Sequence, residues 1–70
     1  MKITLDKTAD AAYIYFREIS KGEVKKTISL NDSINIDLDI NGKALGIEIL
    51  DASKNLPSST LNSAIILENN

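Results

Sequence analysis

Residues 34–49, INIDLDINGKALGIEI, decide the fold, because apolar and polar side chains alternate strictly before a turn signal. The apolar set of the first half is Ile34, Ile36, Leu38 and Ile40. A period of two over a stretch of this length is typical of a β-strand with one buried face. Asn41-Gly42 follows, the dipeptide preferred by two-residue type I′ turns, whose central positions both need a positive φ. The stretch therefore predicts a β-hairpin.

A two-residue turn at 41–42 also predicts the pairing of the two strands. On the apolar face the expected pairs are Ile40 with Lys43, Leu38 with Leu45, Ile36 with Ile47, and Ile34 with Ile49. On the polar face they are Asp39 with Ala44, Asp37 with Gly46, and Asn35 with Glu48. A slip by one residue would bring apolar side chains against polar ones along the whole hairpin. Turn chemistry and face matching thus favour the same register.

The same residues match a calcium-binding pattern. Residues 37–48 fit the EF-hand loop D-x-[DN]-x-[DN]-G-x₅-E at every specified position. An EF-hand loop is entered and left by helices, whereas a strand pattern precedes this one and Pro57 interrupts any helix after it. We interpret the match as coincidental. Asp37, Asp39 and Glu48 share the polar face and stay the candidates for loose binding of a hard divalent cation.

Strand patterns also precede the hairpin. Ile3 and Leu5 alternate with polar residues, AAYIYF at 11–16 reads as a second strand, and EVKKTISL at 23–30 reads as a third. In that third segment the residues on one face are Val24, Lys26, Ile28 and Leu30.

The C-terminal segment allows two interpretations. Ser58 or Ser59 would cap a short helix over roughly Thr60–Leu67, while AIIL at 64–67 would serve equally as a fifth strand. We expect an α+β fold, an antiparallel β-meander of four to five strands with a short C-terminal helix. The chain is expected to form a single domain, with the sheet in residues 1–50 and the helix or tail in residues 51–70.

Composition excludes several classes of function. The 70 residues include neither cysteine nor histidine and carry a net charge of −2. Disulfides, thiolate metal sites and the usual general base are therefore excluded. The basic residues are scattered, so direct binding of nucleic acid is not expected. Without a signal-peptide pattern or an apolar run of about 18 residues, the sequence predicts a cytoplasmic protein with no membrane contact. We expect no cofactor, and no spacing argues for an enzyme.

The apolar face of the predicted sheet is larger than one short helix can cover. An exposed apolar surface of this kind is typical of a contact with another protein, so we expect a homodimer or a complex with a second protein. Tyr13 and Tyr15 share a strand face. They would form either an aromatic platform for a partner or ordinary cross-strand packing. The candidate contact residues are Tyr13, Tyr15, Leu61, Ile65 and Ile66. A protein-interaction module is the favoured function, and a module that binds a small molecule or divalent cation on the acidic face is the alternative.

Most of the chain, from about Lys2 to Leu56, resembles a small prokaryotic family of uncharacterised proteins, DUF2283. The resemblance rests on DKTADAAYIYF at 6–16, GEVKKTISL at 22–30, INIDLD at 34–39 and especially GIEILDAS at 46–53. Ala12 and Tyr15 depart from the leucine and basic residue often found there. The resemblance implies a stand-alone domain with no established catalytic residue. It also suggests a likeness to the antitoxin half of toxin–antitoxin pairs.

Overall fold

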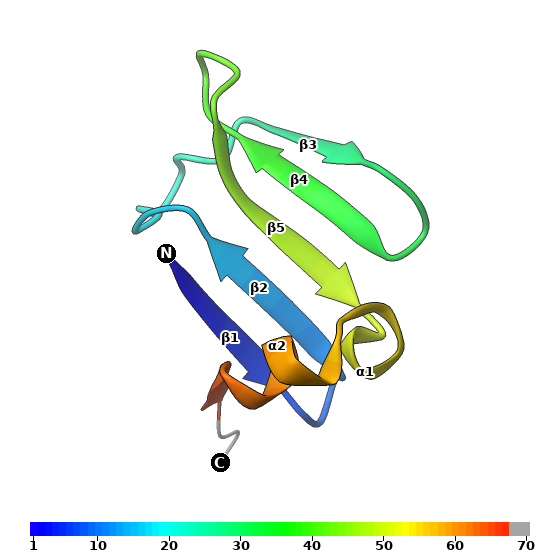
Figure 1. Cartoon of the computed structure of the whole chain (residues 1–70). Coiled ribbons are helices and arrows are strands. Elements are labelled where there is room, and N and C mark those ends of the chain that lie inside the picture. The colour runs from blue at the N-terminus through cyan, green and yellow to red at the C-terminus, as the bar shows by residue number, and fades with distance from the viewer. Residues whose placement is uncertain (68–70) are drawn as a thin grey trace.

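A computed structural model of the chain describes residues 1–67 as six strands and two short helices (Figure 1). In chain order the elements are β1 (Lys2–Asp6), β2 (Ala11–Tyr15), β3 (Lys26–Ser29), β4 (Ile34–Leu38), β5 (Ala44–Leu50), α1 (Ala52–Asn55), α2 (Ser58–Asn62) and β6 (Ile65–Leu67). The strands form one sheet in the order β3-β4-β5-β2-β1-β6. The α+β class is confirmed.

The predicted antiparallel meander is wrong in two respects. Only β3, β4 and β5 follow one another as a meander, because β2 pairs with β5 and the chain reaches β3 through residues 16–25. The sheet is also mixed, since β6 pairs in parallel with β1 while the other neighbours are antiparallel. A parallel neighbour needs a crossover connection, and α1 and α2 form it.

The predicted register of the central hairpin is confirmed over most of its length. Ile34 pairs with Ile49 and Ile36 with Ile47, and the polar-face pairs Asn35–Glu48 and Asp37–Gly46 also form. Face matching thus predicted this part of the sheet correctly. The register shifts at Leu38, which pairs with Ala44 instead of Leu45.

The shift arises because the turn is not the expected two-residue one. The Gly42 amide donates to the Asp39 carbonyl at 3.0 Å, and the Asp39 amide donates to the Lys43 carbonyl at 2.9 Å. Gly42 alone in this turn has a positive φ, 80°. This is a three-residue loop closed by a glycine in the left-handed region. It leaves Ile40, expected on the apolar face, 78% exposed.

The Asp39 side chain explains the choice of turn. Its Oδ1 accepts hydrogen bonds from the amides of Asn41 and Lys43, both at 2.9 Å. An aspartate that bonds to the backbone two residues on stabilises a turn that begins at the aspartate itself. The carboxylate therefore overrides the preference of Asn41-Gly42 for the shorter loop.

The C-terminal segment contains both alternatives, one after the other. Residues 58–62 form α2 and residues 65–67 form β6, so the expected helix over Thr60–Leu67 is wrong in its second half. Pro57 is the N-cap of α2, which has no side-chain cap bond, so the predicted capping by Ser58 or Ser59 is also wrong. Proline is well suited to the start of a helix, where an amide would lack a partner. The one-turn helix α1 was not predicted.

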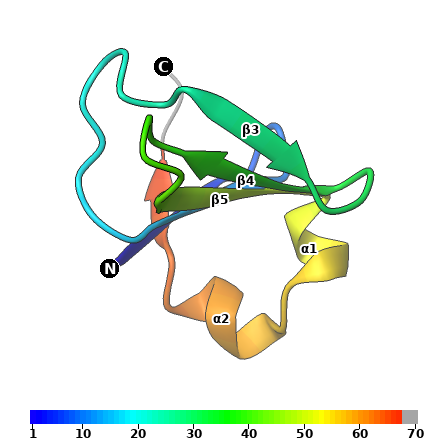
Figure 2. The same ribbon diagram turned by 90° about the horizontal axis from the view of Figure 1, so that it is seen from above.

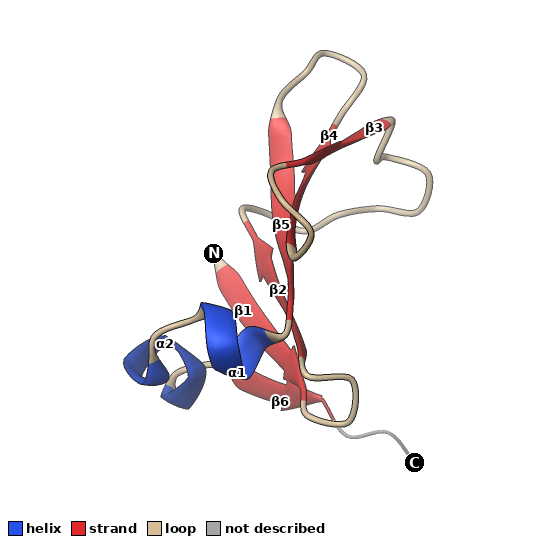
Figure 3. Cartoon of the chain, turned by 90° about the vertical axis from the view of Figure 1, so that its right-hand side faces the viewer, coloured by secondary structure: helices blue, strands red, loops and turns tan. Residues whose placement is uncertain are grey.

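Both helices lie on the same side of the sheet, and β3 lies towards the opposite side (Figures 2 and 3). We call the sheet surface under the helices the helix face and the other one the open face. The buried core on the helix face is Leu5, Ala12, Ile49 and Ala52. The partly buried residues packed against it are Ile14, Ile34, Ile47, Leu56, Leu61 and Ala64. The helices thus cover the β1, β2 and β5 side of the sheet.

The helices leave the outer part of the apolar face uncovered. Val24, Ile28 and Leu30, which the sequence places on that face, are exposed. The predicted third strand is also shorter than expected, since β3 includes only residues 26–29 and all four are exposed. Leu45, in contrast, is fully buried.

Candidate functional site

The β1–β2 turn is tied to the start of α1 by Asp10. The Asp10 carboxylate accepts two hydrogen bonds from Ser53, one from its amide at 3.0 Å and one from its hydroxyl at 2.7 Å. The Asp10 carbonyl accepts a third from the Ala52 amide at 2.9 Å. These are the amides that open a helix and would otherwise lack acceptors. Asp10 thus caps the start of α1, although it lies far from this helix in the sequence.

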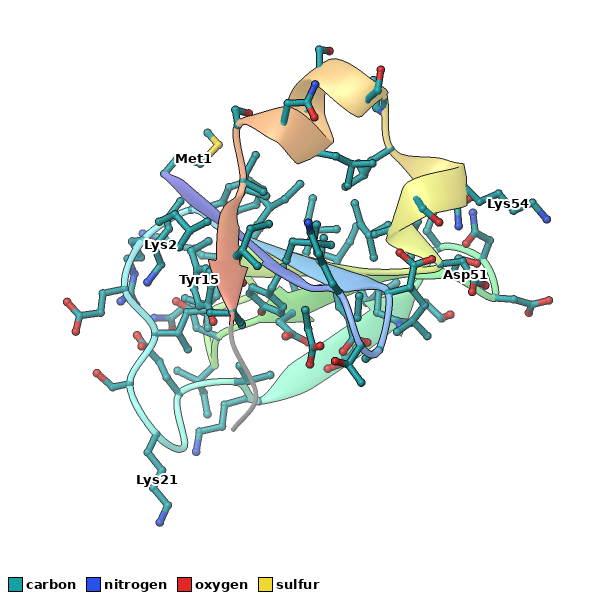
Figure 4. The ribbon with its side chains drawn as sticks, turned by 90° about the horizontal axis from the view of Figure 1, so that it is seen from below. Met1, Lys2, Tyr15, Lys21, Asp51 and Lys54 are labelled. Carbon is teal, nitrogen blue, oxygen red and sulfur yellow. The ribbon has the colours of Figure 1, made fainter. Side chains whose placement is uncertain are left out.

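Two aspartates in the left-handed region shape this contact. Asp10 has a φ of 51° and Asp51 a φ of 50°. Aspartate is among the few residues other than glycine that visit this region. Asp51 turns the chain from β5 into α1 (Figure 4), which places the small side chain of Ala52 in the core with complete burial. GIEILDAS and DKTADAAYIYF, two of the four strings that carry the family resemblance, therefore meet at one place.

A hollow of about 650 Å³ lies beside this contact, between α2, β6 and the β1–β2 turn. Apolar side chains come from β1, α2, β6 and the connection between α2 and β6, and polar ones come from the β1–β2 turn, α1 and the end of α2. The lining residues are Leu5, Lys7, Asp10, Ser53, Leu61, Asn62, Ala64 and Ile66. Two of the predicted contact residues, Leu61 and Ile66, are thus brought together here.

β6 is the outermost strand on this side of the sheet and is apolar on both faces. Ile65, Ile66 and Leu67 are 54%, 43% and 46% exposed. Ile66 pairs with Leu5 on the helix face, whereas Ile65 and Leu67 alternate onto the open face. The predicted contact residues Ile65 and Ile66 therefore point to opposite sides of one edge strand.

A row of polar groups crosses the open face above Gly46. The Tyr13 hydroxyl donates to Asp37 Oδ2 at 2.5 Å, and the Thr27 hydroxyl donates to Asp37 Oδ1 at 2.6 Å. Tyr13 lies on β2 and Asp37 on β4, so the tyrosine ring must cross β5 to reach it. A Cβ atom on Gly46 would lie 2.7 Å from the Tyr13 hydroxyl oxygen and 2.8 Å from the Ile14 carbonyl oxygen. The missing side chain of Gly46 is what admits the ring.

This environment disfavours ionisation of Tyr13. Partial burial raises the pKa of the Tyr13 hydroxyl well above its usual range, with further increases from its hydrogen bond to Asp37 and from that negative charge. Tyr13 is therefore a neutral hydrogen-bond donor at physiological pH. Its geometry supports packing and hydrogen bonding across the sheet rather than proton transfer.

Tyr15, the second aromatic candidate, lies beside Tyr13, with ring centroids 4.6 Å apart. Its other neighbour is Lys2, whose ammonium lies 4.7 Å from the Tyr15 ring centroid, within the range of a cation–π contact. Lys2 and Tyr15 lie at the same end of the sheet in Figure 4. The predicted sharing of a face by the two tyrosines is confirmed, and both rings are already in contact with neighbouring side chains.

The three carboxylates that were candidates for binding a cation accept hydrogen bonds from different partners. Asp37 accepts from Tyr13 and Thr27, and Glu48 accepts from the Asn35 side chain at 3.2 Å. Asp39 accepts from two amides of its own turn. Within residues 1–67 no three acidic side chains come close enough to hold a metal ion.

Sequence reasoning missed Asp10, Ser53 and Thr27. Asp10 and Ser53 lie 43 residues apart, and no local pattern in the sequence brings them together. The available signal was that both residues lie in strings that carry the family resemblance, Asp10 in residues 6–16 and Ser53 in residues 46–53. Thr27 also lies in such a string, at residues 22–30, but its partner Asp37 becomes known only when β3 is paired with β4.

Across the described part of the chain, none of the helices is both long and apolar enough to cross a membrane. A family model described as a protein of unknown function, DUF2283, matches residues 2–53, a span that includes Asp10 and Ser53 and ends before β6. Neither a curated protein nor a solved structure matches the chain. Because the family model covers well over half of the sequence, the chain belongs to the DUF2283 family.

Proposed function

We propose that this protein is a protein-interaction module whose contact surface is the β6 edge, residues 65–67. The observation that carries the proposal is that an outermost strand is uncharged and apolar on both faces, with all three residues exposed. A strand with apolar residues on both faces is typical of the interior of a sheet. Exposed apolar edges are normally avoided, since they invite pairing with another chain.

The opposite edge of the sheet has the protection that β6 lacks. β3 begins with Lys26, and Lys25 immediately precedes it. Charged side chains, lysine above all, are the usual means by which an edge strand resists association. The two edges of this sheet therefore differ in chemistry, and the difference favours β6 as the surface that receives a partner.

The size of the core supports the same proposal. Within residues 1–67 the buried apolar side chains are Leu5, Ala12, Leu45, Ile49 and Ala52. Two of these are alanines, and a chain of this length buries only a modest fraction of its surface. A partner that binds only the folded chain would add to its stability. An antitoxin-like role is the form of this proposal in which the partner is a different protein.

The experiment is site-specific photo-crosslinking of the full-length protein in its host. A photoreactive amino acid replaces Ile65 on β6 or, as the matched control, Ile28 on β3, an edge residue with 43% exposure. We expect light-dependent adducts with protein from position 65 and few from position 28. Absence of any adduct from position 65, or equal yields from both positions, would contradict the proposed function.

A further inference from the structure

We propose that the partner at the β6 edge is a second copy of this chain, which pairs β6 with β6 in antiparallel orientation about a two-fold axis at Ile66. This inference rests on the proposed function and names its partner. The result would be a continuous sheet through both copies, with the helix pairs on the same side because the axis is perpendicular to the sheet.

The chemistry of the strand makes it complementary to itself. In a symmetric antiparallel pair each residue of one copy meets a residue of the same strand in the other copy. Like charges directly opposite each other destabilise such a pair. β6 consists of two isoleucines and a leucine, so no repulsion arises. β3, in contrast, begins with Lys26 and follows Lys25, and charged side chains on an edge strand disfavour its pairing with another chain.

The proposed axis places the apolar side chains of both copies in register. Ile66 meets Ile66 of the second copy on the helix face, and each Ile65 meets a Leu67 on the open face. Pairs of β-branched and aliphatic side chains in these positions are stabilising. All three residues of the edge are about half exposed, and the pairing would remove part of that exposed apolar surface from water.

The hollow beside β6 is a second feature that favours another copy of the chain as the partner. Ile66 lines this hollow of about 650 Å³ together with Leu5, Leu61 and Ala64, so the hollow lies beside the residue at which the proposed axis is placed. Ile66 of the second copy would lie next to this apolar lining. The contact would therefore extend from the strand edge to the space between β6 and α2, rather than consist of backbone pairing alone.

The absence of cysteine from the sequence permits a sharp test of the register. Directly opposite residues in antiparallel strands have Cα atoms about 4.5–5.5 Å apart, within the range that a disulfide spans. Residues offset by two positions lie about 7–8 Å apart, at or beyond the limit of about 7 Å for a disulfide. An Ile66→Cys variant should therefore cross-link to itself, whereas an Ile65→Cys variant should not.

The full-length single-cysteine variants are oxidised at micromolar concentration after circular dichroism has shown that each is folded. We expect covalent dimers of Ile66→Cys, several-fold more than of Ile65→Cys or of an Ile28→Cys control on β3. An equimolar mixture of Ile65→Cys and Leu67→Cys should form the mixed dimer. Efficient cross-linking of all variants alike would overturn the register, and cross-linking of none would overturn the pairing.

The photo-crosslinking experiment separates failure of this inference from failure of the proposed function. An adduct from position 65 with twice the chain mass of 7.6 kDa supports a second copy. If position 65 gives only adducts of other masses and Ile66→Cys forms no disulfide-linked dimer, the self-pairing is refuted. The proposed interaction module would then still stand. Absence of adducts of either kind would refute both.

Discussion

Asp10 holds Ser53, a residue 43 positions later in the chain, by accepting hydrogen bonds from both its amide and its hydroxyl. This contact joins the β1–β2 turn to the start of α1. It thereby fixes the helical segment that leads to α2 and β6. The contact thus connects two of the four strings that carry the family resemblance with the position of the proposed interaction edge.

Loss of this carboxylate should destabilise the fold measurably. We expect Asp10→Ala to reduce the free energy of unfolding by about 1–3 kcal/mol, since it removes two charge-assisted bonds and places alanine in the left-handed region. Asp10→Asn should cost less, because asparagine tolerates that conformation and retains one acceptor. Ser53→Ala removes only the hydroxyl bond and should cost about 1 kcal/mol. Urea unfolding measures all three, and equal stabilities of Asp10→Ala and wild type would contradict the assignment.

Gly46 should not tolerate a side chain while Tyr13 is present. Gly46→Ala places a methyl group against the Tyr13 ring and the Ile14 carbonyl, so we expect a loss of about 1–3 kcal/mol in unfolding free energy. In the Tyr13→Ala background the same substitution should cost clearly less, because one of the two clashes is gone. A double-mutant cycle by thermal or urea unfolding gives the coupling between the two positions. Strict additivity would show that the ring does not occupy this space.

Alkaline pH should weaken the fold through Tyr13. Its pKa is higher in the folded chain than in the unfolded one, where it is about 10. The folded state therefore holds the proton more tightly, and the associated stability is complete below about pH 10 and is lost as the pH rises beyond it. We expect wild type to lose stability faster than Tyr13→Phe above that pH. Parallel slopes of stability against pH for the two proteins would argue against a protonated Tyr13–Asp37 bond.

The turn between β4 and β5 can be identified by substitution. Gly42 has a positive φ, so Gly42→Ala should cost about 1–2 kcal/mol. Asn41 does not, so Asn41→Ala should change the unfolding free energy by no more than about 0.5 kcal/mol. Asp39→Ala should be destabilising, because it removes the acceptor of two amide bonds. A large loss at Asn41→Ala would instead indicate the two-residue turn.

The alternation of apolar and polar residues was sufficient to predict the register of the β4–β5 hairpin away from its turn. The pairing of Ile34 with Ile49 and of Ile36 with Ile47 agrees with the alternation, because a slip by one residue would bring polar side chains onto the apolar face. The turn was missed because two signals competed. Asn41-Gly42 favours a two-residue loop, whereas the Asp39 carboxylate stabilises a longer one, and their relative strength is not visible in the sequence.

The secondary structure of the C-terminal segment could not be predicted from the sequence, because it depends on tertiary structure. AIIL at 64–67 suits a helix and a strand equally, and only the open side of β1 makes it a strand. The contact of Asp10 with Ser53 depends on the same arrangement, since it forms only when α1 is placed next to the β1–β2 turn. The resemblance to DUF2283 identified the strings that contain both residues without indicating that they touch.

The mass of the protein in solution tests the central claim most directly. Light scattering at micromolar concentration should give twice the chain mass of 7.6 kDa for wild type. Ile65→Lys places a charge on the β6 edge and should give the mass of a single chain, with the circular dichroism of the folded protein retained. A single-chain mass for wild type, or a dimer that persists in Ile65→Lys, would contradict self-association through β6.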